Sequence, residues 1–331
     1  MSDRPRSTLI RPPPPDPSKS VFEHVLELTP LNDIGPDIFT NTRPLWVPSG
    51  ARGVFGGAVI AQCLIASQRT VPAEFSIHSM HCYFVLAGNP DIPLLYHVER
   101  VREGKSFATR TVQARQRGTP IFTTTMSFVR EGSGGAKCLR HQVPMVDIPG
   151  PVDDHPDMKY QQSPFESQRV AILNHSSPHP HEKRTRQWVR ARGTISPSAG
   201  HEAHISALAY MSDSWFIGTV SRVHNLSTWG EGADSALDSS ENDPAHGTPS
   251  APKPEIGMIV SLDHSIYFHS PRAFRADEWL LSEMNSPWAG DGRGVVEQRL
   301  FSRDGALLAT CVQEGVVRLK QDAEGVKASK L

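Results

Sequence analysis

The feature that most constrains this chain is an internal repeat. Residues 111–129 align without a gap with residues 298–316, and the turn glycines of the two copies coincide. Each copy alternates apolar and polar residues on both sides of its glycine, a pattern that predicts a β-hairpin. In the same alignment Met126 lies over Gln313, so an apolar position of the first copy is a primary amide in the second. We therefore expect two related modules, of which only the second carries the polar groups that chemistry needs.

Each half of the sequence predicts one buried helix followed by four strands. Small apolar residues recur at helical spacing after Gly56, and residues 201–216 show a similar stripe in the second half. Residues 21–28 have an ambiguous pattern, but turn signals at residues 29–30, 32–33 and 35–36 favour an opening hairpin of short strands. The order predicts an α+β fold in which a curved antiparallel sheet wraps a helix, twice in one chain. The expected strands are residues 75–86, 94–102, 107–116 and 121–130, and then 258–268, 278–284, 294–301 and 306–318.

Composition sets the expected domain boundaries. A chain of 331 residues is long enough for two domains that each bury a core. Residues 230–254 are rich in Asp, Glu, Ser, Pro and Gly, and we expect them to form a disordered insert between the second helix and its strands. The expected segments are a disordered proline-rich arm at 1–20, an N-terminal module at 21–130, a connector at 131–180, a C-terminal module at 181–320 and a polar tail at 321–331.

Charge and cysteine usage exclude several classes of partner. The formal net charge is −1 and the sequence pI is about 7.0, so no field attracts nucleic acid or an anionic membrane. The longest apolar run, residues 58–66, is too short to span a bilayer, and we expect a soluble protein. The four cysteines lack metal-ligand spacing, and three lie in apolar runs as reduced buried thiols do. No metal site is predicted.

The last three residues predict a cellular address. The chain ends in Ser329, Lys330 and Leu331, the tripeptide that a peroxisomal import receptor reads. The residues before it are polar, so we expect the terminus to stay free in water, as such a signal requires. The sequence therefore predicts import into the peroxisomal matrix.

Three polar residues of the second half stand where chemistry could use them. Asp263 lies in the middle of an alternating segment, although a carboxylate is disfavoured in a strand and costly to bury. Gln313 is a primary amide among apolar neighbours and must find hydrogen-bond partners. Ser286 precedes a proline, which favours an extended backbone that could hold its hydroxyl inward. The ordinary alternatives are an ion pair or edge position for Asp263 and a turn for Ser286.

Five runs of sequence carry a family resemblance: residues 54–59 (VFGGAV), 81–84 (HCYF), 261–269 (SLDHSIYFH), 286–290 (SPWAG) and 304–315 (DGALLATCVQEG). Together they resemble the type II acyl-CoA thioesterases, and the peroxisomal members are the nearest likeness. The resemblance covers about residues 20–320 apart from the connector and the insert, and it implies a double hotdog fold with two helix-wrapped sheets. It also implies a catalytic trio of aspartate, serine or threonine, and glutamine, which falls by motif position on Asp263, Ser286 and Gln313.

The resemblance implies a mechanism without a covalent intermediate, a metal or an organic cofactor. The trio would hold one water molecule, with Asp263 as general base, and direct it at the carbonyl of an acyl-CoA thioester. Backbone N–H groups of Gly56 and Gly57, at a helix start, are expected to stabilise the oxyanion. Acyl-chain preference stays open, as does the oligomeric state, since related enzymes often form homo-oligomers.

Other functions were weighed against hydrolysis. The glycines of residues 50–57 match neither the dinucleotide fingerprint nor the lysine-bearing phosphate loop. His78 and His81 should point to opposite faces of a strand, which disfavours a shared metal. Two alternatives to hydrolysis remain: a hotdog enoyl-CoA hydratase and a non-catalytic acyl-CoA binding protein. An assay of thiol release separates them from a thioesterase.

Overall fold

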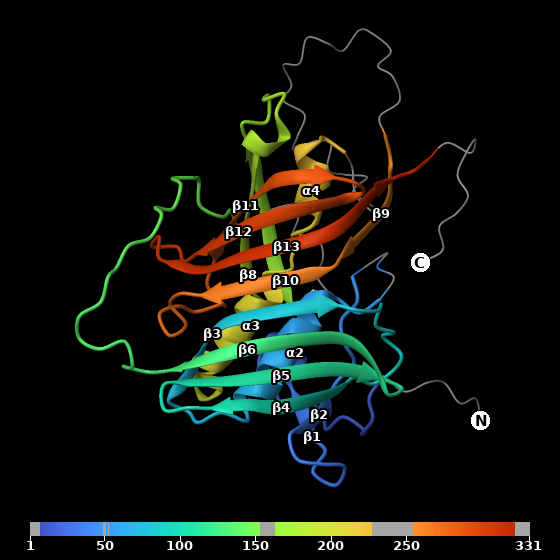
Figure 1. Cartoon of the computed structure of the whole chain (residues 1–331), viewed down its shortest axis with the longest axis vertical. Helices are drawn as coiled ribbons and strands as arrows, with labels where there is room; N and C mark the ends of the chain where they lie inside the picture. Colours follow the sequence, from blue (N-terminus) through green and yellow to red (C-terminus); the bar gives the residue numbers. More distant parts are fainter. Residues whose placement is uncertain (1–6, 49–50, 52, 153–162, 227–253, 322–331) are drawn as a thin grey trace.

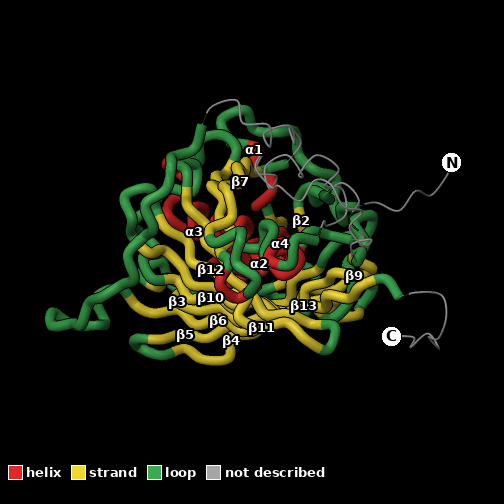
Figure 2. Tube along the Cα trace, turned by 90° about the horizontal axis from the view of Figure 1, so that it is seen from above, coloured by secondary structure: helices red, strands yellow, loops and turns green. Residues whose placement is uncertain are grey.

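The computed structural model describes residues 7–48, 51, 53–152, 163–226 and 254–321. Thirteen described strands belong to one sheet, in the order β1-β2-β4-β5-β6-β3-β10-β13-β12-β11-β8-β7, with β9 paired to β13 beside this path. The strands of each half lie together, the first half below and the second half above in the view of Figure 1. The helices lie in the concave side of the curved sheet (Figure 2).

The N-terminal module contains the predicted helix and its four strands, preceded by a short helix and two short strands. Helix α2 has no charged residue and is buried around most of its circumference, as a helix with apolar residues on all sides requires. The elements are α1 (Val21–Leu26), β1 (Leu28–Pro30), β2 (Ile38–Asn41), α2 (Gly56–Gln68), β3 (Phe75–Phe84), β4 (Leu95–Glu103), β5 (Phe107–Gln116) and β6 (Thr119–Arg130).

The C-terminal module repeats this plan around its own helix, α3, which packs against α2. Its elements are β7 (Phe165–Leu173), the 3-10 turn η2 (Pro180–Glu182), β8 (Arg184–Ala191), the 3-10 turn η3 (Pro197–Ala199), α3 (Gly200–Met211), α4 (Gly218–Val223), β9 (Ile256–Ser261), β10 (Asp263–Phe268), β11 (Leu280–Gly290), β12 (Arg293–Phe301) and β13 (Leu307–Leu319).

The structure confirms the repeated hairpin. Strands β5 and β6 pair antiparallel, as do β12 and β13, and the turn of each hairpin contains a glycine in the left-handed region, Gly118 with φ 80° and Gly305 with φ 89°. A side chain is strained at such φ values, whereas glycine adopts them freely. Met126 and Gln313, which coincide in the repeat, are both fully buried.

The expectation of two separate sheets is corrected by the pairing of β3 with β10. These strands exchange antiparallel hydrogen bonds in a register that places Cys82 opposite His264 and Tyr83 opposite Asp263. Each strand would otherwise be the edge of its own module, with unpaired backbone groups. Their pairing satisfies those groups and turns two sheets into one.

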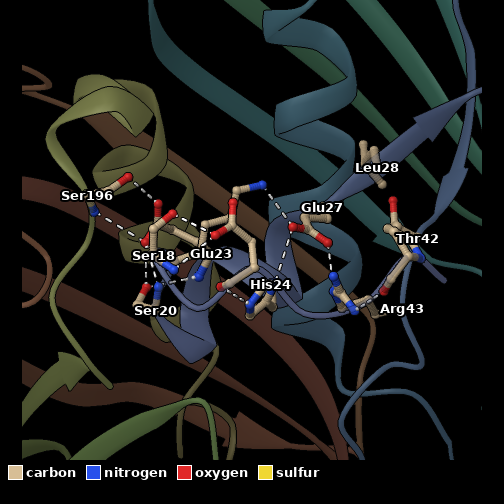
Figure 3. Close-up of polar contacts among 12 residues, drawn as sticks. Ser18, Ser20, Glu23, His24, Glu27, Leu28, Thr42, Arg43 and Ser196 are labelled. Atoms are coloured by element: carbon tan, nitrogen blue, oxygen red, sulfur yellow. Dashed lines mark hydrogen bonds and ion pairs between the residues drawn. The ribbon is translucent and has the colours of Figure 1, made fainter.

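The predicted opening hairpin is present as the antiparallel strands β1 and β2, but it begins later than expected, because residues 21–26 form helix α1. Ser20 caps this helix: its hydroxyl accepts from the Glu23 N–H, and the Glu23 carboxylate accepts from the Ser20 N–H. This capping box satisfies N–H groups that a helix start leaves free. Figure 3 shows the same carboxylate reaching Ser196 of the other module, whose N–H and hydroxyl both donate to it. Glu23 therefore links α1 to the C-terminal module.

Two expected boundaries also move. Residues 7–20 of the arm are ordered against the N-terminal module, where Thr8 is buried and the Arg43 guanidinium donates to the Pro13 carbonyl at 3.1 Å. A polyproline segment leaves its carbonyls free for such donors. Strand β7 lies inside the expected connector and pairs with β8, so the C-terminal module begins before residue 181.

Parts of the other predictions lie outside the described residues. Almost all of the insert expected at 230–254 and of the tail expected at 321–331, including the terminal tripeptide, belongs to ranges that the structure does not describe. Within the described ranges, no helix combines the length and the apolar character needed to cross a membrane.

Candidate active site

Gln313 is the centre of a buried polar cluster between the helices and the sheet. It lies in the middle of β13, and its amide nitrogen Nε2 is 2.9 Å from Asp213 Oδ1 and 3.0 Å from His264 Nδ1. Its oxygen, Oε1, is buried and has no hydrogen-bond partner among the described residues. A buried acceptor without a partner is unusual in a native fold and marks a place where a substrate or water group can be bound.

Asp213 joins the two modules at this cluster. It lies just after the end of α3, and its carboxylate accepts a hydrogen bond from the backbone N–H of Gly57, in the first turn of α2. Burial raises the pKa of Asp213 to about 6, although the hydrogen bonds from Gln313 and Gly57 act in the opposite direction. The carboxyl group therefore titrates close to neutrality, where a general base is most effective.

The close approach of Asp213 requires a glycine at the start of α2. A Cβ atom at Gly56 would lie 2.6 Å from Asp213 Oδ2 and 2.7 Å from a ring carbon of Phe84. No real side chain tolerates both contacts without a shift of the neighbours. The glycines predicted to stabilise an oxyanion are thus at the site, but the Gly57 N–H already holds the carboxylate.

His264 completes the cluster as a neutral imidazole. Complete burial lowers the pKa of His264 to about 3, so its contact of 3.8 Å with Asp213 is not an ion pair. Its Nε2 lies 3.0 Å from the Ser212 hydroxyl, which donates to the Ala209 carbonyl at 2.9 Å. The Phe216 ring packs against the imidazole nearly at right angles.

Asp263 does not point toward Gln313. Its cross-strand neighbour on β3 is Tyr83, which is 62% exposed, whereas the next pair along, His264 and Cys82, is buried. Cross-strand neighbours share a face of the sheet and successive residues alternate, so Asp263 lies on the outer face and Gln313 on the inner one. The Asp263 carboxylate accepts from the Glu314 N–H at 2.7 Å, and partial burial raises its pKa.

Ser286 is buried but belongs to another part of the sheet. It lies on β11, and β12 separates it from β13, which places the two backbones about 10 Å apart. Its hydroxyl donates to the Val295 carbonyl at 2.9 Å, next to a register shift between β11 and β12. Among the described residues, no direct hydrogen bond joins Ser286 or Asp263 to Gln313. The expected convergence of the three side chains on one water molecule therefore stays a prediction.

A β-bulge between β9 and β10 changes which residues share a face with Gln313. Ser261 pairs with Gly315 and Ser265 pairs with Val312, so four steps on the β9–β10 path oppose three steps on β13. The extra residue reverses the alternation between Ser261 and His264. Both therefore lie on the same face as Gln313.

Ser261 is a hydroxyl residue that this register places on the same face as Gln313. A Cβ atom on its partner Gly315 would lie 2.5 Å from the side chain of Ile217, which shows that this face looks toward the helices. Gln313 is the diagonal neighbour of Ser261 across the ladder, at a Cα separation of about 7–8 Å.

Sequence reasoning missed Asp213, Ser261 and His264. Asp213 carried a usable signal, because it is the only charged residue between Glu202 and Arg222 in an otherwise apolar and small-residue segment. Ser261 and His264 carried none, since their shared face depends on the bulge. No group of three or more His, Cys, Asp or Glu side chains in the described ranges is arranged to hold a metal ion.

A surface cleft of about 340 Å³ lies elsewhere. It is at the far end of α2, beside the α1 cluster of Figure 3, and Lys19, Glu27 and Arg69 are among its lining residues. Burial alone would raise the pKa of Glu23 there, but hydrogen bonds from Ser196 and Ser20 outweigh it and lower the pKa. Lys19 pairs with Glu27 at 2.9 Å, and the Arg69 guanidinium donates to the Leu28 carbonyl at 2.9 Å. The cleft does not include Gln313 or Asp213 of the buried cluster.

The two halves match the two domains of one family. Residues 43–129 match the acyl-CoA thioesterase N-terminal domain, and residues 148–317 match the acyl-CoA thioesterase C-terminal domain. The fold and the family models define the class of protein as a double-module thioester hydrolase. The chain belongs to the acyl-CoA thioesterase family.

Individual relatives agree with this assignment. The chain is 38% identical to mouse acyl-coenzyme A thioesterase 8, over 93% of this chain and 91% of the mouse protein. It is 26% identical to the peroxisomal acyl-coenzyme A thioester hydrolase 1 of Saccharomyces cerevisiae, over 90% of this chain and 94% of the yeast protein.

Solved structures support the fold. An acyl-CoA thioesterase II from Mycobacterium marinum superposes with a TM-score of 0.67 at 29% identity, over 92% of this chain and 99% of that one. A protein from Alicyclobacillus acidocaldarius described as having a hot dog fold superposes with a TM-score of 0.63 over 90% of this chain and 97% of that one, and at 18% identity it shows the fold alone.

Proposed function

We propose that this chain hydrolyses acyl-CoA thioesters with a water molecule held by Asp213, Gln313 and Ser261. This set differs from the trio of Asp263, Ser286 and Gln313 that motif position implies, which stays the alternative proposal, and only Gln313 is common to both. The observation that carries the proposal is a buried carboxylate with a pKa of about 6, hydrogen-bonded to a buried amide whose oxygen has no partner.

Each group has a distinct part in the proposed reaction. The Asp213 carboxylate removes a proton from water as the water oxygen attacks the thioester carbonyl. Gln313 Oε1 and the Ser261 hydroxyl hold the water in the orientation for attack. The tetrahedral intermediate then expels the thiolate of coenzyme A, which takes the proton from Asp213. The products are a free carboxylic acid and coenzyme A, and the carboxylate is restored.

The oxyanion is proposed to form at the start of α2. The first N–H groups of a helix lack partners within the helix, and the helix dipole favours a negative charge there. Gly56 would supply its N–H to the oxyanion. Gly57, which was expected to do the same, positions the base through its hydrogen bond to Asp213.

We also propose a peroxisomal location and an import receptor as partner. The support is the terminal tripeptide of Ser329, Lys330 and Leu331, together with the printed name of the yeast relative. The proposed substrate is an acyl-CoA, as the family indicates. No nucleic-acid partner is proposed. A homo-oligomer remains compatible with the family.

The test compares two aspartate variants in an assay of thiol release from a long-chain acyl-CoA. We expect Asp213→Asn to lower kcat by about a hundredfold or more, the usual effect of losing one catalytic group. The matched control Asp263→Asn lies on the same sheet but on its outer face, and should stay near wild-type turnover. The reverse order of the two variants would restore the trio from motif position.

The same assay decides between hydrolysis and its alternatives. Release of free thiol with formation of the carboxylic acid supports a thioesterase. Addition of water to an enoyl-CoA without thiol release would indicate a hydratase. Tight binding of acyl-CoA without turnover of any chain length would indicate a binding protein, and the proposal would be rejected.

A further inference from the structure

We infer that His264 is a positioning residue that fixes the amide of Gln313 with its nitrogen toward Asp213 and its oxygen toward the reacting water. The inference rests on the proposed function for the identity of the reaction. It rests on hydrogen-bond geometry for the orientation itself. No group of His264 needs to touch the substrate.

The donors and acceptors around His264 allow one arrangement. The Ser212 hydroxyl donates its only proton to the Ala209 carbonyl, so it can only accept from His264 Nε2. The imidazole is neutral, so its one proton is on Nε2 and Nδ1 is an acceptor. Gln313 Nε2 then donates one proton to His264 Nδ1 and the other to Asp213 Oδ1.

This chain of hydrogen bonds matters most when Asp213 carries a proton. An ionised Asp213 can only accept, and by itself it holds the amide nitrogen of Gln313 in place. Once Asp213 has taken the proton from water, it can donate, and a flipped amide with its oxygen toward Asp213 would become acceptable. His264 Nδ1 still demands a donor at that moment, so the amide cannot flip in mid-reaction.

The surroundings keep the imidazole itself in place. The Phe216 ring packs against it nearly at right angles, at a centroid distance of 5.1 Å and an interplanar angle of 75°. The His264 backbone is held in the β3–β10 seam, where its carbonyl accepts from the Cys82 thiol. The acceptor that faces Gln313 is therefore rigid, as a positioning group needs to be.

The test uses two substitutions with opposite expectations. His264→Phe keeps the planar ring and removes the acceptor, and we expect kcat to fall by about tenfold to a hundredfold with little change in KM. His264→Asn restores an acceptor near the Nδ1 position, and we expect it to recover most of the loss. The matched control His269→Phe removes an imidazole that contacts Thr310 on the exposed side and should leave kcat unchanged.

Two outcomes overturn the inference. If folded His264→Phe retains wild-type kcat, the imidazole does not position Gln313. If the asparagine variant loses as much as the phenylalanine variant while both are folded, the acceptor is not what matters. Should His264→Phe fail to fold, Ser212→Ala is used instead. This substitution removes the acceptor that keeps the His264 proton on Nε2, and a partial loss of kcat is expected. An unchanged kcat counts against the inference.

A second measurement does not depend on activity. The 15N NMR spectrum of wild-type protein should show His264 protonated on Nε2 and accepting at Nδ1, and Ser212→Ala should shift this tautomer balance. A proton on Nδ1 in the wild type would overturn the inference even if the protein is a thioesterase. The expected tautomer in a protein that turns over no acyl-CoA would instead reject the proposed function and leave the geometry standing.

Discussion

Replacing Asp213 with asparagine should change how the stability of the fold depends on pH. The pKa of Asp213 is raised by burial from 3.8 to about 6. Between these values the unfolded chain has lost the proton and the folded chain keeps it. Because the folded state then binds more protons, its free energy of unfolding falls as the pH rises through this window. Asparagine carries no such proton, so the variant lacks this loss.

The magnitude follows from the two pKa values. A difference from 3.8 to about 6 corresponds to about 3 kcal/mol, since each pH unit contributes about 1.36 kcal/mol. Asparagine also changes the hydrogen bonds to Gln313 and Gly57, which adds an offset between the proteins. That offset is nearly independent of pH. The pH dependence of the difference in free energy of unfolding between the two proteins therefore reports the buried carboxyl group alone.

The measurement is urea-induced unfolding of both proteins at intervals from about pH 4 to about pH 7. We expect the free energy of unfolding of the asparagine variant to rise by about 3 kcal/mol relative to that of the wild type across that range. The change should be complete slightly above pH 6. Asp263→Asn provides the comparison at an outer-face carboxylate. If the curves for Asp213→Asn and the wild type run parallel, Asp213 is not a buried group with a raised pKa, and the proposed base loses its main support.

Three further results are expected. The kcat of the wild type should fall about tenfold per pH unit below about pH 6 and level off above that pH, because only ionised Asp213 accepts the proton of water. A flat profile through this region would exclude Asp213 as the base. Gly56→Ala should lower both kcat and the free energy of unfolding, because the added Cβ would lie 2.6 Å from Asp213 Oδ2. The loss in free energy of unfolding should be about 1–3 kcal/mol. A variant with unchanged kcat and stability would show that the site adapts freely. Glu23→Gln should lower the free energy of unfolding by about 1–3 kcal/mol above the unfolded pKa of 4.5, because hydrogen bonds to Ser196 and Ser20 lower the pKa of Glu23 in the folded state. The difference should disappear as the pH falls. Urea unfolding at neutral and at acid pH checks this, and an equal effect at both would contradict it.

The repeat in the sequence predicted most of the fold. Hairpin and helix patterns depend on local periodicity, which is visible in one chain, and the two glycine turns fell where expected. Helix α1 was missed because residues 21–26 are short and their pattern is ambiguous without the capping box of Ser20 and Glu23. The seam between β3 and β10 was missed because pairing between distant edge strands leaves no local signal.

The candidate site was predicted less completely. Gln313 was found because a polar residue at a core position is visible in the repeat, and its burial is confirmed. Asp263 was chosen as a carboxylate within a strand and by its motif position, and its role stays a prediction. The bulge between Ser261 and His264 could not be predicted, because it depends on the pairing with β13. Asp213 belongs to a turn after a helix, where periodicity carries no information about which way a side chain points.

The contact of Gly57 with Asp213 places the base of one module on the helix start of the other. In a dimer of identical subunits, two such contacts would be built, and every substitution would alter both. Covalent fusion removes that constraint, so the first half can hold Met126 where the second holds Gln313. The N-terminal module supplies the helix start that completes the site of the C-terminal module. Halves that are expressed separately should therefore regain activity only when they are mixed.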